Sequence, residues 1–372
     1  MNEYNSFNQT KGLTWINHYN NIIRWHKKRK QELYPPIGIT IDLTTTCNLR
    51  CQGCNSVRSW DKNNSLCKEE VFKIIDYLVE WRTYTKRSDV LLSCCFAGGG
   101  EPTLHKDFPE IIEYASKYFE IGMSTNGTTL NNKRVREAIV KYADFCGVSV
   151  DSATPETWGR YKQVEDEMYY KVLNGMKKTI KYINKLGNRK RKHKKLDFVY
   201  KFLITQTNQH EILQAAMLAM NIGFKTFFVR PAAMAGLEAF SMEDETLDVR
   251  SIEQQVSKAR SLSSRQFKVY GSFGRVNPVT YGKVHNFKKC YATPLLVQIC
   301  GDGYVYQCID CRYKAKHRMC PWDKLRGYWG SQTHKNRVNK LKVKDCPRCA
   351  FGVYNEQISK CVIEDKLWRN FP

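Results

Sequence analysis

The chain has 372 residues, of which 42% are hydrophobic and 12% aromatic, so it can bury a sizeable core and does not have the composition of a disordered protein. Lysine and arginine total 60 against 36 aspartates and glutamates, and the formal net charge of +24 favours a negatively charged partner. The 15 cysteines are odd in number and too sparse for a secreted disulfide scaffold. We therefore expect a cytoplasmic protein that uses some of its thiols as metal ligands.

No secretory signal is expected, because residues 1–12 are polar, and no apolar run is long enough for a transmembrane helix. A helical lead over residues 12–34 is followed by alternating strand and helix patterns. The predicted strands are 38–43, 90–97, 120–124, 145–150, 196–205 and 226–229, and the predicted helices between them are 68–82, 107–118, 132–142, 168–186 and 210–222. This alternation predicts an α/β fold with a parallel sheet, either a doubly wound sheet or an incomplete barrel.

The alternation stops after residue 231, and the rest of the chain has a different composition. Residues 236–285 are predicted to be a connector. From residue 286 onward the chain is rich in cysteine, glycine, proline and aromatic residues, and a metal or cluster would help this tail to hold together. A basic run, residues 188–195 (NRKRKHKK), is either a solvated loop, a patch for anions or nucleic acid, or a docking face for an acidic electron donor.

Three cysteines, Cys47, Cys51 and Cys54, directly follow the first predicted strand. Parallel α/β folds place their active sites at this end of the strands. Three thiolates on one loop suit a soft metal, but they are one too few for a closed zinc site or a fully ligated cubane.

The spacing CxxxCxxC at this place resembles the signature of the radical SAM enzymes. After the second strand, AGGGEPTLH (97–105) resembles the glycine-rich turn that, in this family, faces the methionyl amine of S-adenosylmethionine (SAM). MSTNGTTL (123–130) and VSVDSATPETW (148–158) resemble the family's next two contact segments. The residues assigned to cofactor binding by this resemblance are Gly98, Gly99, Gly100, Glu101, Ser124, Asn126 and Ser149. Gly53 departs from the family, which commonly has an aromatic residue there to pack on the adenine.

The resemblance implies a partial (β/α)6 TIM-like barrel over residues 38–235, preceded by the helical lead over residues 1–37. It also implies a [4Fe–4S] cluster on the three cysteines, with one iron left free to bind SAM. Reduction of SAM would then yield a 5′-deoxyadenosyl radical that abstracts hydrogen from the substrate.

The tail, residues 286–372, resembles the SPASM and twitch extensions of this family, which bind auxiliary clusters. The residues that carry this resemblance are Cys290, Gly303, Cys308, Cys346 and Cys349. A full SPASM domain would have two further cysteines, and Asn355 and Ser359 occupy their places, so the tail is similar to the shorter twitch type. A second, auxiliary [4Fe–4S] cluster on Cys290, Cys308, Cys346 and Cys349 is implied. A zinc ribbon is the alternative for the two CxxC pairs, Cys308 with Cys311 and Cys346 with Cys349, although the 34 residues between the pairs exceed its usual spacing.

Candidates for direct catalytic roles come from single residues. Cys300 lies between two auxiliary-cluster ligands and is a candidate hydrogen-atom donor, or simply a packed thiol. Arg230 ends the sixth strand and could pair with a carboxylate or phosphate of SAM or the substrate. Asp151 could orient the substrate or cap the helix that follows it.

The sequence thus favours a radical SAM dehydrogenase or epimerase acting on a carbohydrate-, aminocyclitol- or nucleotide-like small molecule, with an anionic substrate preferred by the charge. An acidic electron donor such as flavodoxin or ferredoxin is expected, and no membrane. Modification of a ribosomally made peptide or of RNA is the alternative within enzymes. A zinc-stabilised nucleic-acid-binding protein is the alternative outside them, although it leaves the glycine-rich turn and the CxxxCxxC loop unexplained.

Overall fold

The computed structural model describes residues 22, 23, 25, 35–56, 59, 62–187, 196–232, 247–271, 287–346 and 349–364. Its strands are β1 (Gly38–Ile41), β2 (Ser93–Phe96), β3 (Glu120–Thr125), β4 (Phe145–Ser149), β5 (Asp197–Ile204), β6 (Thr226–Pro231), β7 (Lys268–Gly271), β8 (Leu296–Ile299), β9 (Tyr304–Tyr306) and β10 (Arg318–Pro321). Its α-helices are α2 (Lys68–Thr85), α3 (Phe108–Ala115), α4 (Lys133–Tyr142), α5 (Pro155–Lys162), α6 (Glu167–Leu186), α7 (Ile212–Ile222), α8 (Val249–Ser261), α9 (Leu325–Tyr328), α10 (Gln332–Lys340) and α11 (Gly352–Ile358). None of the helices in this described part of the chain combines the length and hydrophobicity needed to cross a bilayer.

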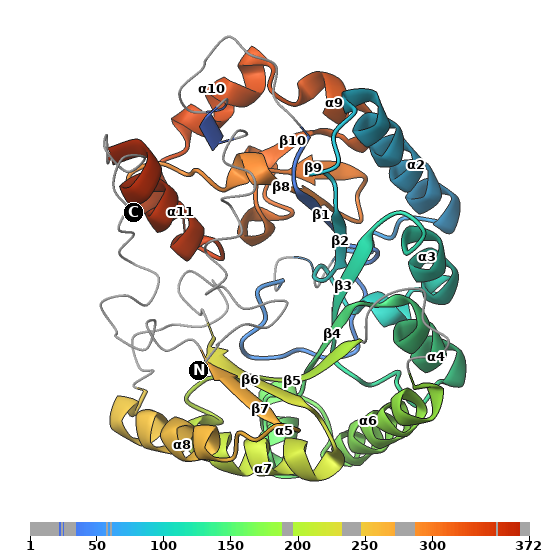
Figure 1. Cartoon of the computed structure of the whole chain (residues 1–372), viewed down its shortest axis with the longest axis vertical. Helices are drawn as coiled ribbons and strands as arrows, with labels where there is room; N and C mark the ends of the chain where they lie inside the picture. The colour runs from blue at the N-terminus through green and yellow to red at the C-terminus, as the bar shows by residue number, and fades with distance from the viewer. Residues whose placement is uncertain are drawn as a thin grey trace.

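All ten strands belong to one sheet, in the order β10-β9-β8-β1-β2-β3-β4-β5-β6-β7. The strands from β8 through β1 to β7 pair in parallel, and β9 and β10 add an antiparallel edge. The sheet is curved, with α2, α3, α4, α6 and α7 along its outer face (Figure 1). This arrangement is the partial TIM-like barrel that the sequence predicts.

Local signals explain where several helices begin and end. Asn132 caps α4, since its side chain accepts hydrogen bonds from the next backbone amides, and Thr154 caps α5 in the same way. Helix α7 ends at Gly223, whose φ of 101° is available to glycine at little cost. The six predicted strands and five predicted helices are confirmed, with shifts of a few residues at their ends.

The alternation continues further along the chain than the sequence predicts. Helix α8 and strand β7 lie inside the segment that was expected to be a connector, and β7 pairs in parallel with β6. Strand β7 escapes prediction because only two of its four residues, Val269 and Tyr270, favour strands, so it carries no clear apolar run. The helical lead is described only at Ile22, Ile23 and Trp25, all helical, and the basic run 188–195 lies outside the described residues.

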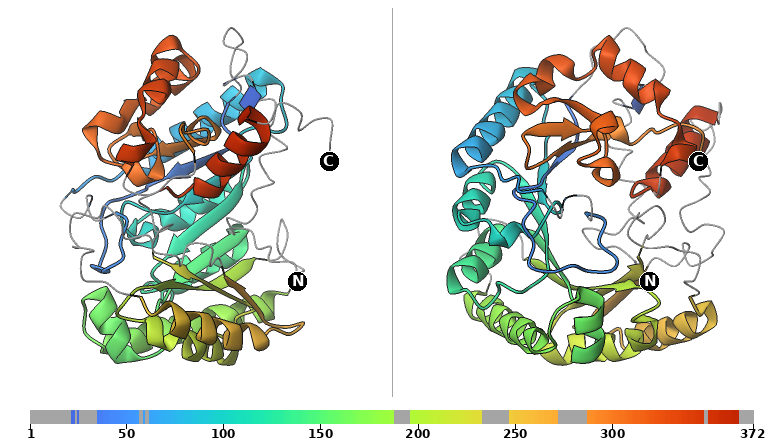
Figure 2. Two further views of the ribbon diagram at one scale, coloured as in Figure 1. Left: turned by 90° about the vertical axis from the view of Figure 1, so that its left-hand side faces the viewer. Right: turned by 180° about the vertical axis from the view of Figure 1, so that it is seen from behind.

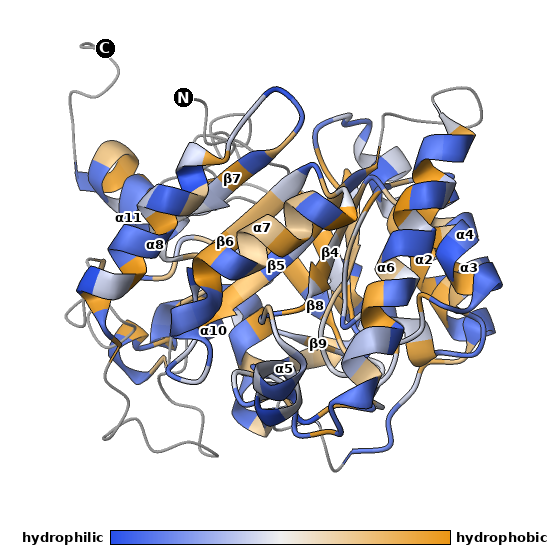
Figure 3. Cartoon of the chain, turned by 90° about the horizontal axis from the view of Figure 1, so that it is seen from below, coloured by the Kyte–Doolittle hydropathy of each residue, from blue (hydrophilic) through white to orange (hydrophobic). Residues whose placement is uncertain are grey.

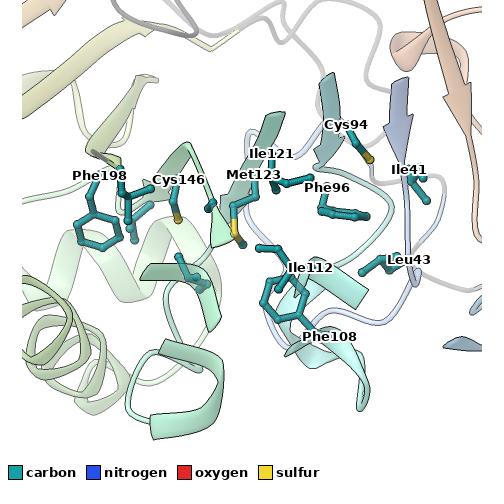
Figure 4. Packing of buried hydrophobic residues seen from close by; sticks show 14 of the residues in the cluster. Ile41, Leu43, Cys94, Phe96, Phe108, Ile112, Ile121, Met123, Cys146 and Phe198 are labelled. Atoms are coloured by element: carbon teal, nitrogen blue, oxygen red, sulfur yellow. The ribbon is translucent and has the colours of Figure 1, made fainter. Parts of the chain in front are cut away.

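The main core lies between the sheet and the outer helices. Side chains from alternate strand positions, such as Phe96 and Met123, pack against Phe108 and Ile112 of α3 (Figure 4). Coloured by hydropathy, the helices carry hydrophilic and hydrophobic residues in alternation along their length (Figure 3). Cys94 and Cys146 are buried in this core, as expected for small apolar side chains, whereas Cys95 points to the other, concave face.

The cysteine-rich tail does not rely on a metal alone for its attachment to the barrel. Strand β8 pairs with β1 along its whole length, from Gly38 with Leu296 to Ile41 with Ile299. Val297 and Val305 of the tail belong to the main apolar core. In the view from behind, the tail also lies beside α2 (Figure 2), and Trp322 of the tail donates to the carboxylate of Glu70 on α2 at 3.1 Å. The boundaries of the four segments, residues 1–37, 38–235, 236–285 and 286–372, stay a prediction.

Candidate active site

The three cysteines of the CxxxCxxC motif lie on the loop that leaves the carboxyl end of β1, and all three are partly exposed. This loop is fixed by backbone hydrogen bonds to the end of α5. The amide of Arg50 donates to the carbonyl of Lys162 at 3.1 Å, and that of Gln52 donates to Tyr161 at 2.9 Å. The loop that carries the thiols is therefore anchored on the helix that follows β4, three strands away from β1 in the sheet order.

The thiols of this loop interact with one another. Burial raises the pKa of Cys47, and it raises that of Cys51 to about 12, with the neighbouring cysteines adding to both shifts. Burial thus favours the protonated thiols, whereas a coordinated metal deprotonates a thiol outright. Over the described part of the chain, no three Cys, His, Asp or Glu side chains converge as ligands of a single ion. Three thiols on one loop are one too few for a closed zinc site, and they suit a cubane cluster that keeps one iron free.

The glycine-rich turn after β2 packs directly on this loop. The amide of Gly100 donates to the carbonyl of Thr44, and the amide of Glu101 donates to that of Thr46, each at 2.8 Å. A Cβ on Gly100 would collide with the Thr46 carbonyl, and Gly98 and Gly99 have φ values of 113° and 74°. The family resemblance assigns these glycines to the methionyl end of SAM. The structure gives an additional reason for Gly99 and Gly100, because they lie against the backbone carbonyls of Thr44 and Thr46.

Glu101 links the turn to the end of β3. Its carboxylate is buried and accepts hydrogen bonds at 2.7 Å from both the Thr125 hydroxyl and the Asn126 amide. Burial raises the pKa of Glu101, while these hydrogen bonds oppose the shift. Asn126 in turn reaches the cysteine loop, because its side-chain amide lies 2.9 Å from the Asn48 oxygen and 3.9 Å from the Cys47 sulfur. Two of the segments predicted to bind SAM, the glycine-rich turn and the end of β3, are thus linked to the cysteine loop near Cys47.

Asp151 is held in a buried ion pair. Its carboxylate lies 2.6 Å from Lys162 Nζ, both side chains are at most 2% exposed, and its other oxygen accepts the amide of Leu203 at 2.8 Å. Lys162 also donates to the carbonyl of Ser149 at 2.9 Å. Asp151 does not cap α5, because Thr154 does. This placement favours a role in positioning the strand ends over direct contact with a substrate.

Lys162 is a residue that sequence reasoning missed. Burial lowers its pKa, but Asp151 and the Cys51 thiol outweigh burial and raise it, so the ammonium ion is kept charged below the cysteine loop. The only signal for it in the sequence is a lysine at the end of an otherwise amphipathic segment, which is ordinary on a helix surface.

A second buried ion pair joins the tail to the barrel mouth. Arg312 follows Cys311 in the tail, and its Nε lies 3.4 Å from the carboxylate of Asp42 at the end of β1. Its guanidinium donates to the hydroxyl of Ser56, two residues after Cys54, at 2.9 Å. A side chain at Gly98 would collide with this guanidinium. Arg312 therefore connects the tail, the cysteine loop and the glycine-rich turn.

Cys300 lies beside this pair and is fully buried. Burial raises the pKa of its thiol well above the ordinary value, and the Asp42 carboxylate adds to the shift. The side-chain amide of Gln298 lies 3.6 Å from the sulfur. A protonated thiol at this place keeps its S–H bond, which is what a hydrogen-atom donor requires, and its role stays a prediction.

The four cysteines predicted to bind the auxiliary cluster, Cys290, Cys308, Cys346 and Cys349, are all partly exposed. Cys346 and Cys349 are both close enough to Cys290 and Cys308 for the charges of those thiolates to raise their pKa, in addition to the effect of burial. These electrostatic effects link thiols that are separated by as many as 59 positions in the sequence, from residue 290 to residue 349, and their role as one ligand set stays a prediction. Three further tail cysteines differ in placement: Cys311 and Cys320 are buried, and Cys361 is exposed.

Asn355 occupies a position where a full SPASM domain would have a cysteine, and its side chain makes hydrogen bonds instead. It is fully buried, and its side-chain oxygen accepts the amides of Tyr291 and Ala292 at 2.6 and 2.9 Å. Its side-chain nitrogen donates to the sulfur of Cys349 at 3.4 Å. Asn355 therefore bridges the chain next to Cys290 and the CxxC pair at Cys349. Ser359, at the other missing position, is also buried and donates to Glu364.

Comparison with known proteins agrees with this geometry. Residues 41–203 match the model of the Radical SAM superfamily. An S-adenosylmethionine-dependent nucleotide dehydratase of Selenomonas ruminantium is 34% identical over 122 residues, 32% of this chain and 40% of that protein, so the chain spans less than half of this relative. A probable GTP 3′,8-cyclase of Saccharolobus islandicus is 24% identical over 314 residues, 82% of this chain and 92% of that one.

The fold is shared with a solved structure as well. SuiB of Streptococcus suis, in a crystal structure bound to S-adenosylmethionine, superposes with a TM-score of 0.63 over 91% of this chain and 75% of that one, at 14% identity. The barrel segment thus resembles the Radical SAM superfamily over residues 41–203, and the chain shares the fold of this solved structure.

Proposed function

We propose that the chain is a radical SAM enzyme that binds a [4Fe–4S] cluster through Cys47, Cys51 and Cys54. When bound, the reduced cluster and SAM supply a 5′-deoxyadenosyl radical that takes a hydrogen atom from the substrate. The observation that supports this proposal most is the gathering of the glycine-rich turn, Asn126 and the cysteine loop into one hydrogen-bonded unit. The contribution of the chain is to orient the cofactor and exclude water.

The residues around the loop would divide the binding of SAM among them. Backbone groups of Gly98, Gly99 and Gly100 would meet its methionyl end, and Ser124, Asn126 and Ser149 its ribose and neighbouring groups. Glu101 holds the Asn126 amide in place, as its 2.7 Å hydrogen bond indicates. The buried Asp151–Lys162 ion pair would fix the cysteine loop relative to β4.

The substrate we propose is a nucleotide-like small molecule, among the carbohydrate-, aminocyclitol- and nucleotide-like classes that the sequence favours. Two relatives support this choice, because their names give a nucleotide and GTP as what they act on. The positive net charge supports an anionic substrate. The electrons would come from an acidic protein such as flavodoxin or ferredoxin, in line with the same charge.

We propose an auxiliary [4Fe–4S] cluster on Cys290, Cys308, Cys346 and Cys349. Their mutual electrostatic interaction and the bridging Asn355 support it. Anaerobic reconstitution with iron and sulfide is expected to give about eight irons per chain, and changing these four cysteines to serine about four. Zinc without iron in the purified protein would overturn both cluster assignments and favour the zinc-stabilised nucleic-acid-binding protein.

Turnover tests the enzyme proposal directly. The reconstituted protein, reduced with dithionite and given SAM alone, is expected to release 5′-deoxyadenosine, measured by liquid chromatography. The matched control is the triple variant Cys47→Ala, Cys51→Ala, Cys54→Ala, which keeps the auxiliary cysteines. Release no higher than in this control would contradict the proposal.

A further inference from the structure

The concave face of the barrel carries two cationic side chains, Lys201 on β5 and Arg230 on β6. On β5, Phe198, Tyr200 and Phe202 belong to the core beneath the helices. Lys201, between them, therefore points to the opposite, concave face, because successive side chains of a strand alternate. Arg230 lies on the neighbouring strand β6 at the same face as Phe228.

Lys201 reaches across its neighbouring strand. Its Nζ donates to the hydroxyl of Ser124 on β3 at 3.0 Å, so the side chain passes over β4. The residue of β4 that it crosses is Gly147, where an added Cβ would collide with the lysine stem. Gly147 itself has an ordinary negative φ, so its lack of a side chain serves this crossing and no strained turn.

Lys201 has no direct ion pair with a carboxylate. Among the described residues, no aspartate or glutamate oxygen lies within 4.0 Å of its Nζ. Burial disfavours its positive charge, Arg230 acts in the same direction, and the more distant Asp151 opposes both. On the same face of the sheet, Phe145, Val199 and Phe228 form a buried apolar cluster. A buried cation that lies next to apolar side chains and a second cation is stabilised when an anion binds beside it.

We propose that Lys201 and Arg230 form a binding site for an oxyanion of the substrate, a phosphate or a carboxylate, on the concave face of the barrel. This inference rests on the proposed function, since it assigns the substrate of the same active site. SAM is expected to place its own charged end at the cysteine loop on β1, whereas these two cations lie on β5 and β6. Ser124 touches both regions, because it is a predicted ribose contact and the partner of Lys201.

The test uses inorganic tripolyphosphate as the probe, titrated calorimetrically into the anaerobically reconstituted full chain in the presence of saturating SAM. Lys201→Met, which keeps the length of the side chain, and Arg230→Gln are each expected to weaken tripolyphosphate binding by about 10- to 100-fold, as for the loss of one charged hydrogen bond. Lys201→Arg keeps the charge and should stay within a few-fold of wild type. Lys225→Met is the matched control, since Lys225 is exposed.

Separate samples of each variant, prepared without SAM, are titrated with SAM, and thermal unfolding confirms that each variant is folded. Unchanged SAM affinity together with weakened tripolyphosphate binding supports the proposal. The proposal is overturned if wild type does not bind tripolyphosphate, if the variants bind it as well as Lys225→Met does, or if only SAM affinity falls. Because this binding needs no SAM cleavage, its failure is distinguishable from a failure to form 5′-deoxyadenosine.

Discussion

The Asp151–Lys162 pair shows how one buried charge can serve a site without touching a substrate. Asp151 has a φ of 63°, a conformation that aspartate tolerates better than most residues. Its two oxygens are used by Lys162 and by the amide of Leu203. The carbonyl of Lys162 accepts from the cysteine loop. The ion pair therefore helps to fix the position of the cysteine loop relative to β4.

The charge state of Lys201 predicts how substrate binding depends on pH. Burial, followed by Arg230, lowers the pKa of Lys201 to about 8, against opposing effects of Asp151, Cys95 and Cys146. The free side chain thus loses its proton as the pH rises through about 8. Tripolyphosphate affinity, measured by calorimetry over this range, is expected to fall on the alkaline side.

Lys201→Arg separates this effect from ionisation of the probe, because arginine stays charged. Its affinity should lack the alkaline decline that wild type shows. Equal pH profiles for the two proteins would contradict the assignment of the decline to Lys201.

Asn355 is expected to decide whether the auxiliary cluster is retained. Asn355→Ala would leave the buried amides of Tyr291 and Ala292 without their acceptor, at about 1–3 kcal/mol for each buried group. Iron analysis after gel filtration should then give about four irons per chain in place of about eight. Asn355→Asp keeps the acceptor and should retain more iron than the alanine variant; an alanine variant with full iron content would rule out this role.

At the scale of elements, the glycine-rich turn and the cysteine loop behave as one unit. Gly100→Ala would push the turn away from the Thr46 carbonyl and break the two hydrogen bonds between the segments. We expect loss of the SAM-binding cluster, with about four fewer irons per chain and no release of 5′-deoxyadenosine. Gly327→Ala is the control, since a Cβ there meets no atom within 4 Å. A fully loaded, active Gly100→Ala variant would refute the coupling.

The elements also show what could be predicted from the sequence. Helices such as α4 and α6 and the strands β1 to β6 were predictable, because each carries a regular apolar pattern and lies between clear breaks. The cysteine motif and the glycine-rich turn were predictable because they are contiguous in the sequence. The hydrogen bonding of the cysteine loop to α5 was not predictable, since it joins residues more than 100 positions apart.

The polar contacts between residues far apart in the sequence were the larger part of what could not be predicted from it. Lys201 could have been noticed as the one charged residue inside the strand sequence FVYKFLI, and a lysine on the concave face of a barrel deserves a functional explanation. Arg312 offers no such signal, because an arginine in a cysteine-rich tail looks like a surface residue. Only the fold shows that it is 4% exposed and paired with Asp42.

At the scale of the whole molecule, Arg312 connects barrel and tail. Burial raises the pKa of Asp42, and Arg312 opposes the shift. Arg312→Met would leave this carboxylate buried without its cation and is expected to lower the free energy of unfolding by about 3–5 kcal/mol. Urea unfolding of the cluster-free chain measures the change.

Asp42→Asn in the same chain removes the stranded charge and should recover part of the loss. If the single and double variants unfold at the same urea concentration, the ion pair does not stabilise the junction.

The pairing of β8 with β1 has a consequence for how the chain folds. The first strand of the barrel hydrogen-bonds to residues 296–299, so a neighbour on one side of it is synthesised only after the rest of the barrel. Until then β1 presents a bare edge of the kind that recruits other chains. Contacts between such distant residues also slow folding, because a long loop must close first. Folding of the barrel during synthesis is therefore expected to wait for the tail, and crowded, rapid expression should favour aggregates over the native sheet.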